Sequence, residues 1–182
     1  MCRKRGKPTL IPALSYINNM VLEIKINPDE ILRRAAKNIG PAAFKGDEIK
    51  KLAADMIETM YVKDGVGLAA PQVGKSIQLC VIAKNFTADQ KEDLILINPK
   101  WEKAGILREW GEEGCLSVPD LYGQVKRHKK IKVEALDENG KPLKFLAGDF
   151  FARIVQHEID HLNGILFIDK AKSLHTVAQE KL

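Results

Sequence analysis

Apolar residues recur at steps of three and four positions between residues 47 and 64. The segment reads DEIKKLAADMIETMYVKD, with acidic residues at its start. Residues spaced in this way share one face of an α-helix, and acidic side chains favour a helix N-terminus. The pattern therefore predicts an amphipathic helix over residues 47–64. Its apolar face consists of Ile49, Leu52, Ala53, Met56, Ile57 and Met60.

Other segments show the short apolar runs that are typical of strands. We expect strands at residues 76–83, 93–99, 124–137 and 142–148, where aliphatic and β-branched residues gather between turn formers. The sequence DENG at residues 137–140 predicts a turn between the last two strands.

Helix signals also occur near the two ends of the chain. Residues 27–39 open with a turn and favour a short helix. A longer helix is expected from Asp149, as its N-cap, to residue 163, with Gly164 as its left-handed stop. A glycine-rich loop at residues 65–74 separates the first long helix from the strands. Because strands and helices do not alternate regularly, this order favours an α+β fold with mostly antiparallel sheet.

Composition and charge divide the chain into two parts. Its 182 residues, 45% of them hydrophobic, suit a single domain with a core. The net charge is +5, but four basic residues before residue 8 contribute +4 of it, so the remainder is nearly neutral. We therefore expect a flexible basic arm at residues 1–19 and one domain at residues 20–182, with no specific nucleic-acid-binding face. The basic residues of the arm are Arg3, Lys4, Arg5 and Lys7.

The cysteine count and the hydropathy pattern bear on location. Three cysteines (Cys2, Cys80 and Cys115) do not form a disulfide framework, and no apolar run reaches the length of a membrane span. We expect a cytoplasmic protein that does not enter a membrane. If the arm is part of a targeting segment, the location is an organelle instead. The other interpretations of the arm are a disordered tail or an upstream start, with Met20 as the working initiator.

Two segments resemble nucleotide-binding loops, but their context is wrong for that function. GVGLAA, residues 65–70, fits a loosened dinucleotide fingerprint, and AAPQVGKS, residues 69–76, approaches a phosphate-binding loop. Both fingerprints need a strand before the loop and a helix after it. Here a helix precedes the loop and a strand pattern follows it, so neither is expected to bind a nucleotide.

The strongest chemical signal is an H-E-x-x-H box at residues 157–161. Two histidines four residues apart on a helix share one face, so both imidazoles can bind one metal ion, with the carboxylate of Glu158 beside them. A catalytic site needs a third protein ligand. The box therefore predicts a metal hydrolase with His157 and His161 as ligands, and leaves its class open.

The search for a third ligand favours the chain before the box. Downstream, Phe167 stands where one protease group has a third histidine, and Glu180 is two residues from the C-terminus. Upstream, Cys115 lies in the glycine-flanked segment EEGCLSVP, and a thiolate is a good ligand for a borderline-soft divalent ion. Cys80 alternates within an apolar strand and is expected in the core. The chemistry alone leaves Cys115 as a candidate.

Three motifs in order resemble those of the peptide deformylases. They are GVGLAAPQ (65–72), EGCLS (113–117) and QHEIDH (156–161), and the likeness extends from about Val21 to Asp169. The resemblance implies Cys115, His157 and His161 as metal ligands. It also implies an α+β fold with antiparallel sheets around the helix that carries the box. The basic arm, a short C-terminal segment and Lys126, where the family often has proline, depart from the pattern.

The resemblance implies removal of the formyl group from the N-terminal formyl-methionine of newly made polypeptides. The expected mechanism has a metal-bound water attack the formyl carbon, with Glu158 as general base and then general acid. The family pattern points to the Gln72 side chain and the Leu116 backbone N–H as donors to the oxyanion. It further implies Fe²⁺ in the cell, with Zn²⁺, Ni²⁺ or Co²⁺ able to substitute.

Substrate contacts are expected from the same motifs. We expect Gly65, Val66 and Gly67 to bind the nascent formyl-methionyl peptide, because glycine admits a close backbone approach. Ile154, one helical turn before the box, is expected either to line the methionine pocket or to pack in the core.

Three further expectations concern the site's supporting contacts and its partners. A pair between Glu113 and Arg127 would brace the cysteine loop, and Asp160 would either orient a ligand or cover the helix surface. A transient ribosome contact is also expected.

Two rival functions give different predictions. A zinc endopeptidase with the same box would take its third ligand from the chain after the helix and would cleave internal peptide bonds. A non-catalytic ribosome- or RNA-binding module would depend on residues 1–19.

Overall fold

The computed structural model describes residues 20–87 and 90–176. Within these ranges the chain forms two α-helices, α1 (Glu48–Val62) and α2 (Asp149–Leu162), and eight strands. The strands are β1 (Gly67–Ala69), β2 (Leu79–Ile82), β3 (Leu94–Lys103), β4 (Arg108–Cys115), β5 (Val118–His128), β6 (Lys130–Leu136), β7 (Pro142–Gly148) and β8 (Lys172–Thr176). Short 3-10 helices occupy Glu30–Arg33, Pro41–Lys45, Ala70–Val73, Lys84–Phe86 and Phe167–Asp169. The expected arm at residues 1–19 lies outside the described residues.

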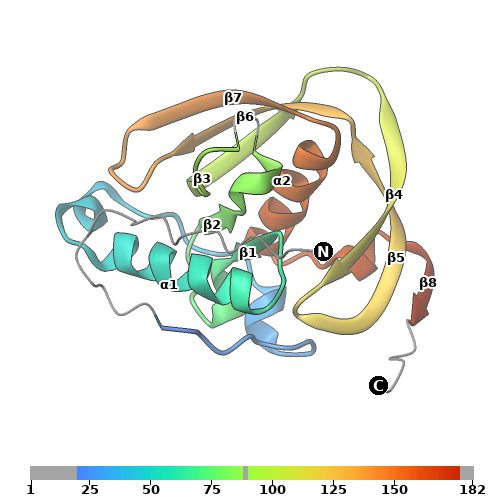
Figure 1. The fold of residues 1–182 in the computed structure, drawn as a ribbon, viewed down its shortest axis with the longest axis horizontal. Helices are drawn as coiled ribbons and strands as arrows, with labels where there is room; N and C mark the ends of the chain where they lie inside the picture. The colour runs from blue at the N-terminus through green and yellow to red at the C-terminus, as the bar shows by residue number, and fades with distance from the viewer. Residues whose placement is uncertain (1–19, 88–89, 177–182) are drawn as a thin grey trace, which may run out of the picture.

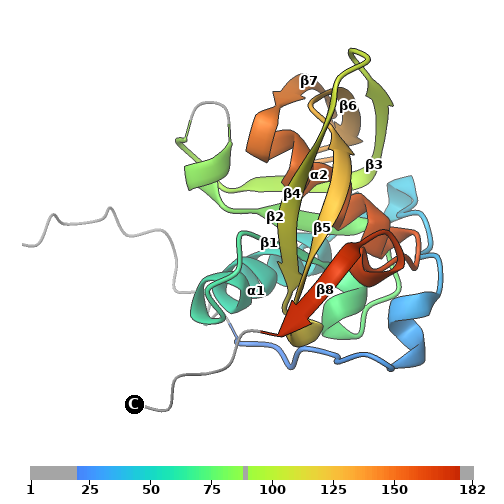
Figure 2. The same ribbon diagram turned by 90° about the vertical axis from the view of Figure 1, so that its right-hand side faces the viewer.

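The strands form two antiparallel sheets. The five-stranded sheet has the order β1-β2-β3-β6-β7, and the three-stranded sheet has the order β4-β5-β8. Figure 1 shows α2 near the centre of the molecule, between the five-stranded sheet and the β4–β5 hairpin. Figure 2 shows the three-stranded sheet face on, covering that side of α2.

Strand β2 is apolar throughout because both of its faces are buried. Cys80 and Ile82 pack in one core cluster with residues of α2, whereas Leu79 and Val81 pack in a second cluster with residues of α1. Successive side chains of a strand point to opposite faces, so this alternation places one helix on each side of the sheet. The expected α+β fold, with antiparallel sheets around the helix that carries the H-E-x-x-H box, is confirmed.

Several local predictions are confirmed. Helix α1 matches the predicted segment, and its expected apolar face is buried or partly buried against the sheet. Strand β7 matches residues 142–148, and the Gly140 N–H donates to the Asp137 carbonyl in the predicted turn. Gly164 has φ +74°, as a left-handed helix stop requires. None of the helices in the described ranges is long and apolar enough to cross a bilayer.

Other local predictions need correction. The predicted strand 124–137 is interrupted at Lys129 and belongs to two strands, β5 and β6. The expected helix in 27–39 is only the 3-10 turn Glu30–Arg33, and the loop at 65–74 contains β1 and a 3-10 turn. Strands β4 and β8 were not predicted. Both carry exposed polar residues, β4 also contains glycines, and neither shows a regular alternation of apolar residues.

The N-cap prediction for α2 is wrong. Gly148 is the N-cap, and Asp149 is the first helical residue, with φ +50°. Its backbone N–H donates to the Lys129 carbonyl at 2.8 Å, and its carboxylate lies 3.3 Å from Lys129 Nζ. The side chain therefore contacts a neighbouring strand end and leaves the first turn of the helix without a side-chain cap.

Candidate metal centre and cavity

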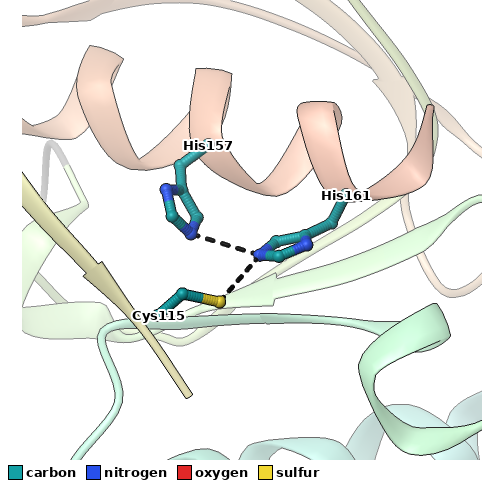
Figure 3. A group of neighbouring side chains, drawn as sticks. All are labelled: Cys115, His157 and His161. Atoms are coloured by element: carbon teal, nitrogen blue, oxygen red, sulfur yellow. Dashed lines mark hydrogen bonds between the residues drawn. The ribbon is translucent and has the colours of Figure 1, made fainter. Parts of the chain in front are cut away.

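The two histidines of the box lie on one face of α2, as their spacing predicted. His161 Nε2 is 3.2 Å from His157 Nε2 and 3.2 Å from Cys115 Sγ. Figure 3 shows Cys115 reaching this point from a strand on the opposite side. The three donor atoms lie within 4.8 Å of one another. The structure therefore brings together the three residues that were predicted as ligands, with the cysteine upstream of the box in the chain.

Glu113 fixes the ring orientation of His157. Its Oε2 lies 2.9 Å from His157 Nδ1. An ionised carboxylate only accepts hydrogen bonds, so Nδ1 carries a hydrogen and Nε2 is the ring nitrogen that faces Cys115 and His161. Burial opposes ionisation of Glu113, but hydrogen bonds from Arg127 and His157 hold the pKa of Glu113 well below its usual range. The carboxylate is therefore ionised when it meets the ring.

The two histidines of the box have opposite electrostatic surroundings. Burial lowers the pKa of His157, but hydrogen bonds to Cys115 and Glu113 outweigh it and raise that pKa to about 10. Burial and the neighbouring His157 hold the pKa of His161 well below its usual value. The surroundings thus favour one positive charge on His157, beside the Cys115 sulfur and two carboxylates. A divalent ion would supply positive charge at the same place when it replaces the proton.

The donor set fits a divalent transition-metal ion. A tetrahedral ion with bonds of about 2.0–2.3 Å separates its ligand atoms by roughly 3.3–3.6 Å. The two 3.2 Å separations around His161 Nε2 are close to that value. A thiolate with two imidazoles leaves one position of a tetrahedral ion open. The residues present therefore fit a catalytic site of the metal-hydrolase type.

Glu158 lies beside the donor atoms and is almost fully buried. Its Oε2 has no hydrogen-bond partner among the residues that the structure describes. Burial raises the pKa of Glu158 to about 7. A Cβ at Gly67 would lie 2.5 Å from Glu158 Oε1, so the glycine leaves the space that this carboxylate occupies. The absence of a side chain at Gly67 therefore helps to position the Glu158 carboxylate. This role is separate from the expected one, which is to let a substrate backbone approach closely.

Gln72 joins the glycine-rich segment to the cysteine loop. Its Oε1 accepts from the Ala69 N–H at 2.8 Å, and its Nε2 donates to Cys115 Sγ at 3.4 Å and to Ser117 Oγ at 3.2 Å. The side chain is buried and held at both ends. Its amide hydrogens thus already point toward the donor atoms, and the bond to Ser117 adds a supporting residue that was not predicted from the sequence.

A cavity of about 430 Å³ opens onto this group of residues. Ile154 lines the cavity and also packs in the core around α2, as one of its two expected placements had it. Its contact with a methionine side chain stays a prediction. Cys80, by contrast, is fully buried in β2, where it is the cross-strand partner of Ala69, and burial raises the pKa of its thiol. The cavity wall includes Gly65, Val66, Gly67, Gln72, Cys115, Leu116, His157 and Glu158, all of them predicted site residues.

A network of buried ion pairs surrounds the predicted ligands. Arg127 Nε and Nη2 donate to the two oxygens of Glu113 at 2.9 and 2.8 Å, and Arg127 also pairs with Asp160. The expected brace between Glu113 and Arg127 is confirmed. Asp160, with Lys170 Nζ 2.6 Å away, is buried and does not simply cover the helix surface.

Phe167 and Arg153 are buried near the ligands in roles that the sequence did not suggest. Phe167, which occupies the third-histidine position of another metal-binding pattern, packs with its ring centroid 6.3 Å from that of His157. Arg153 donates to Glu113 from α2. The signal for Arg153 is its position four residues before His157, on the same helix face.

Comparisons with known proteins agree on one family. A family model described as polypeptide deformylase matches residues 21–177. The chain is 43% identical over 164 residues to the peptide deformylase of Microchaete diplosiphon, covering 90% of this chain and 86% of that protein. It is 48% identical over 150 residues to peptide deformylase 2 of Vibrio cholerae, covering 82% and 85% of the two chains.

Solved structures show the same likeness. A Met-Ala-Ser-bound class I type b peptide deformylase from Acinetobacter baumannii superposes with a TM-score of 0.78 at 36% identity. The match covers 84% of this chain and 99% of that one. A peptide deformylase from Synechococcus elongatus in complex with actinonin gives a TM-score of 0.77 at 42% identity, covering 84% and 81% of the two chains.

Proposed function

Since this chain belongs to the polypeptide deformylase family, whose metal-dependent hydrolases remove the N-terminal formyl group of formyl-methionyl peptides, we propose how its own residues perform that reaction. Cys115, His157 and His161 hold the metal. The observation that supports this assignment is the convergence of their Sγ and two Nε2 atoms at a cavity beside a buried carboxylate. A divalent ion bound there supplies a water of lowered pKa and a positive charge for the developing oxyanion.

Glu158 is the proton carrier. Its pKa of about 7 suits both halves of the task, since the carboxylate accepts a proton from the attacking water and then gives it to the leaving amine. Its unpartnered Oε2 is available for that exchange. The water oxygen forms a bond to the formyl carbon, the carbon–nitrogen bond breaks, and the products are formate and a free N-terminal methionine.

Two donors stabilise the oxyanion that forms on the formyl oxygen. Gln72 contributes its side-chain amide, which is already directed at the donor group by the bond from Ala69 to its Oε1. Leu116 contributes its backbone N–H from the loop that follows Cys115 and lines the cavity. Donors fixed before the reaction need no reorganisation in the transition state, and each typically contributes about 3–4 kcal/mol.

The peptide substrate lies along the cavity wall formed by Gly65, Val66 and Gly67. These residues lead into β1, which is an edge strand of its sheet, so backbone groups on its free side can bind an extended peptide. Ile154 contributes apolar surface for the methionine side chain. Its buried position on α2, three residues before His157, keeps that surface next to the metal ligands.

The proposal extends to the metal, the partners and the location. Fe²⁺ is the metal in the cell, and Zn²⁺, Ni²⁺ or Co²⁺ can replace it, because one thiolate with two imidazoles accepts all of these ions. The natural substrates are nascent formyl-methionyl chains, reached in the cytoplasm, or in an organelle if residues 1–19 belong to a targeting segment. Contact with the ribosome is transient.

The direct test measures formate release from formyl-Met-Ala by iron-loaded protein purified without oxygen. Wild-type protein is expected to release formate stoichiometrically with free Met-Ala. The Cys115→Ser variant is expected to keep its fold but to lose most of its iron and activity, because a hydroxyl is a much poorer ligand than a thiolate. Cleavage of an internal bond in an unformylated peptide, without formate release, would instead support the endopeptidase alternative. Full metal occupancy in Cys115→Ser would refute the ligand assignment.

A further inference from the structure

The proposed ligands come from two separate parts of the fold. Cys115 is the last residue of β4 in the three-stranded sheet, whereas His157 and His161 project from α2. The separation of the thiolate from the imidazoles therefore depends on the contacts that hold β4 against α2. Those contacts determine whether the three donors are already in place when a metal ion arrives.

Arg153 makes the densest set of such contacts. It lies on α2 one turn before His157, and its side chain is 7% exposed. Its Nη1 donates to Glu113 Oε1 at 2.8 Å, to the Val125 carbonyl at 3.0 Å and to the Gly111 carbonyl at 3.3 Å. Its Nη2 donates to the Glu109 carbonyl at 3.2 Å. One guanidinium thus joins the helix to alternate residues of β4 and to the adjacent β5.

The sequence of β4 makes room for this guanidinium. A Cβ at Gly111 would lie only 2.6 Å from Arg153 Nη2, so any larger residue would displace the arginine. The contact therefore depends on both residues, because the glycine in β4 leaves the space that the arginine of α2 occupies. The carbonyls of Glu109 and Gly111 and the Glu113 carboxylate are the acceptors along one strand.

Arg127 shows that charge compensation alone does not explain Arg153. Arg127 already makes a two-bond pair with Glu113, at 2.9 and 2.8 Å, so Glu113 retains a buried cation without Arg153. What Arg153 adds is the link to three backbone carbonyls of the sheet. That link fixes position, because backbone carbonyls move only with their strand.

From this geometry we infer that Arg153 is a positioning residue, which holds the Cys115-bearing strand against α2 and so presets the spacing of the three metal ligands. The inference rests on the proposed ligand set. It assigns to Arg153 an effect on metal affinity that is separate from its effect on stability. Residues that orient ligands in this way typically change metal affinity by about 10–100-fold when they are replaced.

The test is a titration of the metal-free protein with Co²⁺. The thiolate-to-cobalt absorption band reports the bond to Cys115, and a competing chelator gives the affinity and the rate of metal release. Arg153→Met keeps the length of the side chain but removes its donors, and it is expected to weaken Co²⁺ binding by about 10–100-fold and to speed release. Arg153→Lys keeps the charge but not the forked donors, so it should restore only part of the affinity.

A matched control separates positioning from general destabilisation. Met56→Ala removes a fully buried side chain on α1, away from the ion pairs, and should lower stability while leaving Co²⁺ affinity and the absorption band unchanged. A loss of affinity in Arg153→Met no larger than in Met56→Ala would overturn the inference. If Arg153→Met does not fold, Gly111→Ala provides a second route, because its methyl group displaces the same guanidinium and should also weaken binding.

Cys115→Ser distinguishes this inference from the proposed function. That variant should lose the thiolate band altogether. If it keeps both the band and full affinity, the proposed ligand set is wrong, whatever Arg153 does. If it loses them while Arg153→Met binds Co²⁺ as wild type does, the ligand set stands and the positioning role of Arg153 is refuted.

Discussion

Glu158 is buried, lies next to the proposed metal ligand His157, and has one oxygen atom without a hydrogen-bond partner among the described residues. These features predict the effect of its replacement. Glu158→Gln preserves size and a hydrogen-bonding group but cannot take up a proton. General acid–base catalysis contributes about 10²–10⁴ in rate, so kcat should fall by that range while KM changes little and the metal content is retained. Measurement of kcat and metal content on one preparation tests both parts. Loss of the metal together with activity would show that Glu158 is structural or a ligand.

A substitution at Gly67 should displace the Glu158 carboxylate without removing it. In Gly67→Ala the new methyl group would lie 2.5 Å from Glu158 Oε1, so the carboxylate must move. A displacement of about 1 Å in a catalytic group can cost roughly 10²-fold in rate. We expect kcat to fall by about 10–100-fold with metal content unchanged. Gly105→Ala, where a Cβ meets nothing within 4 Å, is the control and should have full activity. Equal activity in both variants would show that Glu158 tolerates the shift.

At the level of single residues, the sequence predicted the metal site only in part. The i, i+4 histidines were predictable because helix geometry alone places them on one face. Cys115 was one candidate by its chemistry, and the choice required the family resemblance, because its distance from the box depends on long-range packing. The sequence places Arg153 on the same helix face as His157, but that position does not show what the side chain contacts. Its role comes from meeting β4, a strand that has no clear sequence pattern of its own.

At the level of elements, the C-terminal end of α2 gives a prediction about stability. Gly164 has φ +74°, and a Cβ there would lie 2.8 Å from the backbone of Arg33. A left-handed conformation costs a residue with a Cβ about 1–2 kcal/mol, and the contact adds to that cost. Gly164→Ala should therefore lower the free energy of unfolding by at least about 1–2 kcal/mol. Urea denaturation of the metal-free protein measures this, with Gly105→Ala as the reference. A change below about 0.5 kcal/mol, the level of ordinary surface substitutions, would contradict it.

The predictability of each element follows from how it is buried. Helix α1 buries one stripe, so its sequence shows the helical period, and β2 is buried on both faces, so its sequence is continuously apolar. Strand β4 gives neither signal. Gly111 leaves space for Arg153, and Glu113 is buried through ion pairs instead of apolar packing. Gly111 and Glu113 thus support the site, and because neither is an apolar core residue, β4 shows no strand pattern of hydrophobic positions.

For the whole molecule, we predict that the catalytic domain needs no residue before Met20. Every proposed site residue lies between Gly65 and His161. The backbone N–H of Met20 donates to Asp55 Oδ1 on α1 at 2.8 Å, and Lys51 Nζ lies 3.4 Å from the other oxygen of that carboxylate. In a chain that begins at Met20, a charged amine replaces this N–H donor, and charge-assisted hydrogen bonds are stronger than neutral ones.

A chain truncated to residues 20–182 should therefore retain its activity. We expect kcat/KM for formyl-Met-Ala within a few-fold of that of the full chain, and a melting temperature that does not fall. Removing residues 1–19 also removes four positive charges, so a binding role for the arm predicts weaker association with ribosomes at an unchanged rate on the dipeptide. Steady-state kinetics and ribosome sedimentation on the two chains separate these outcomes. A loss of two orders of magnitude in dipeptide turnover would show that the arm completes the active site, and that the catalytic domain does not begin at Met20.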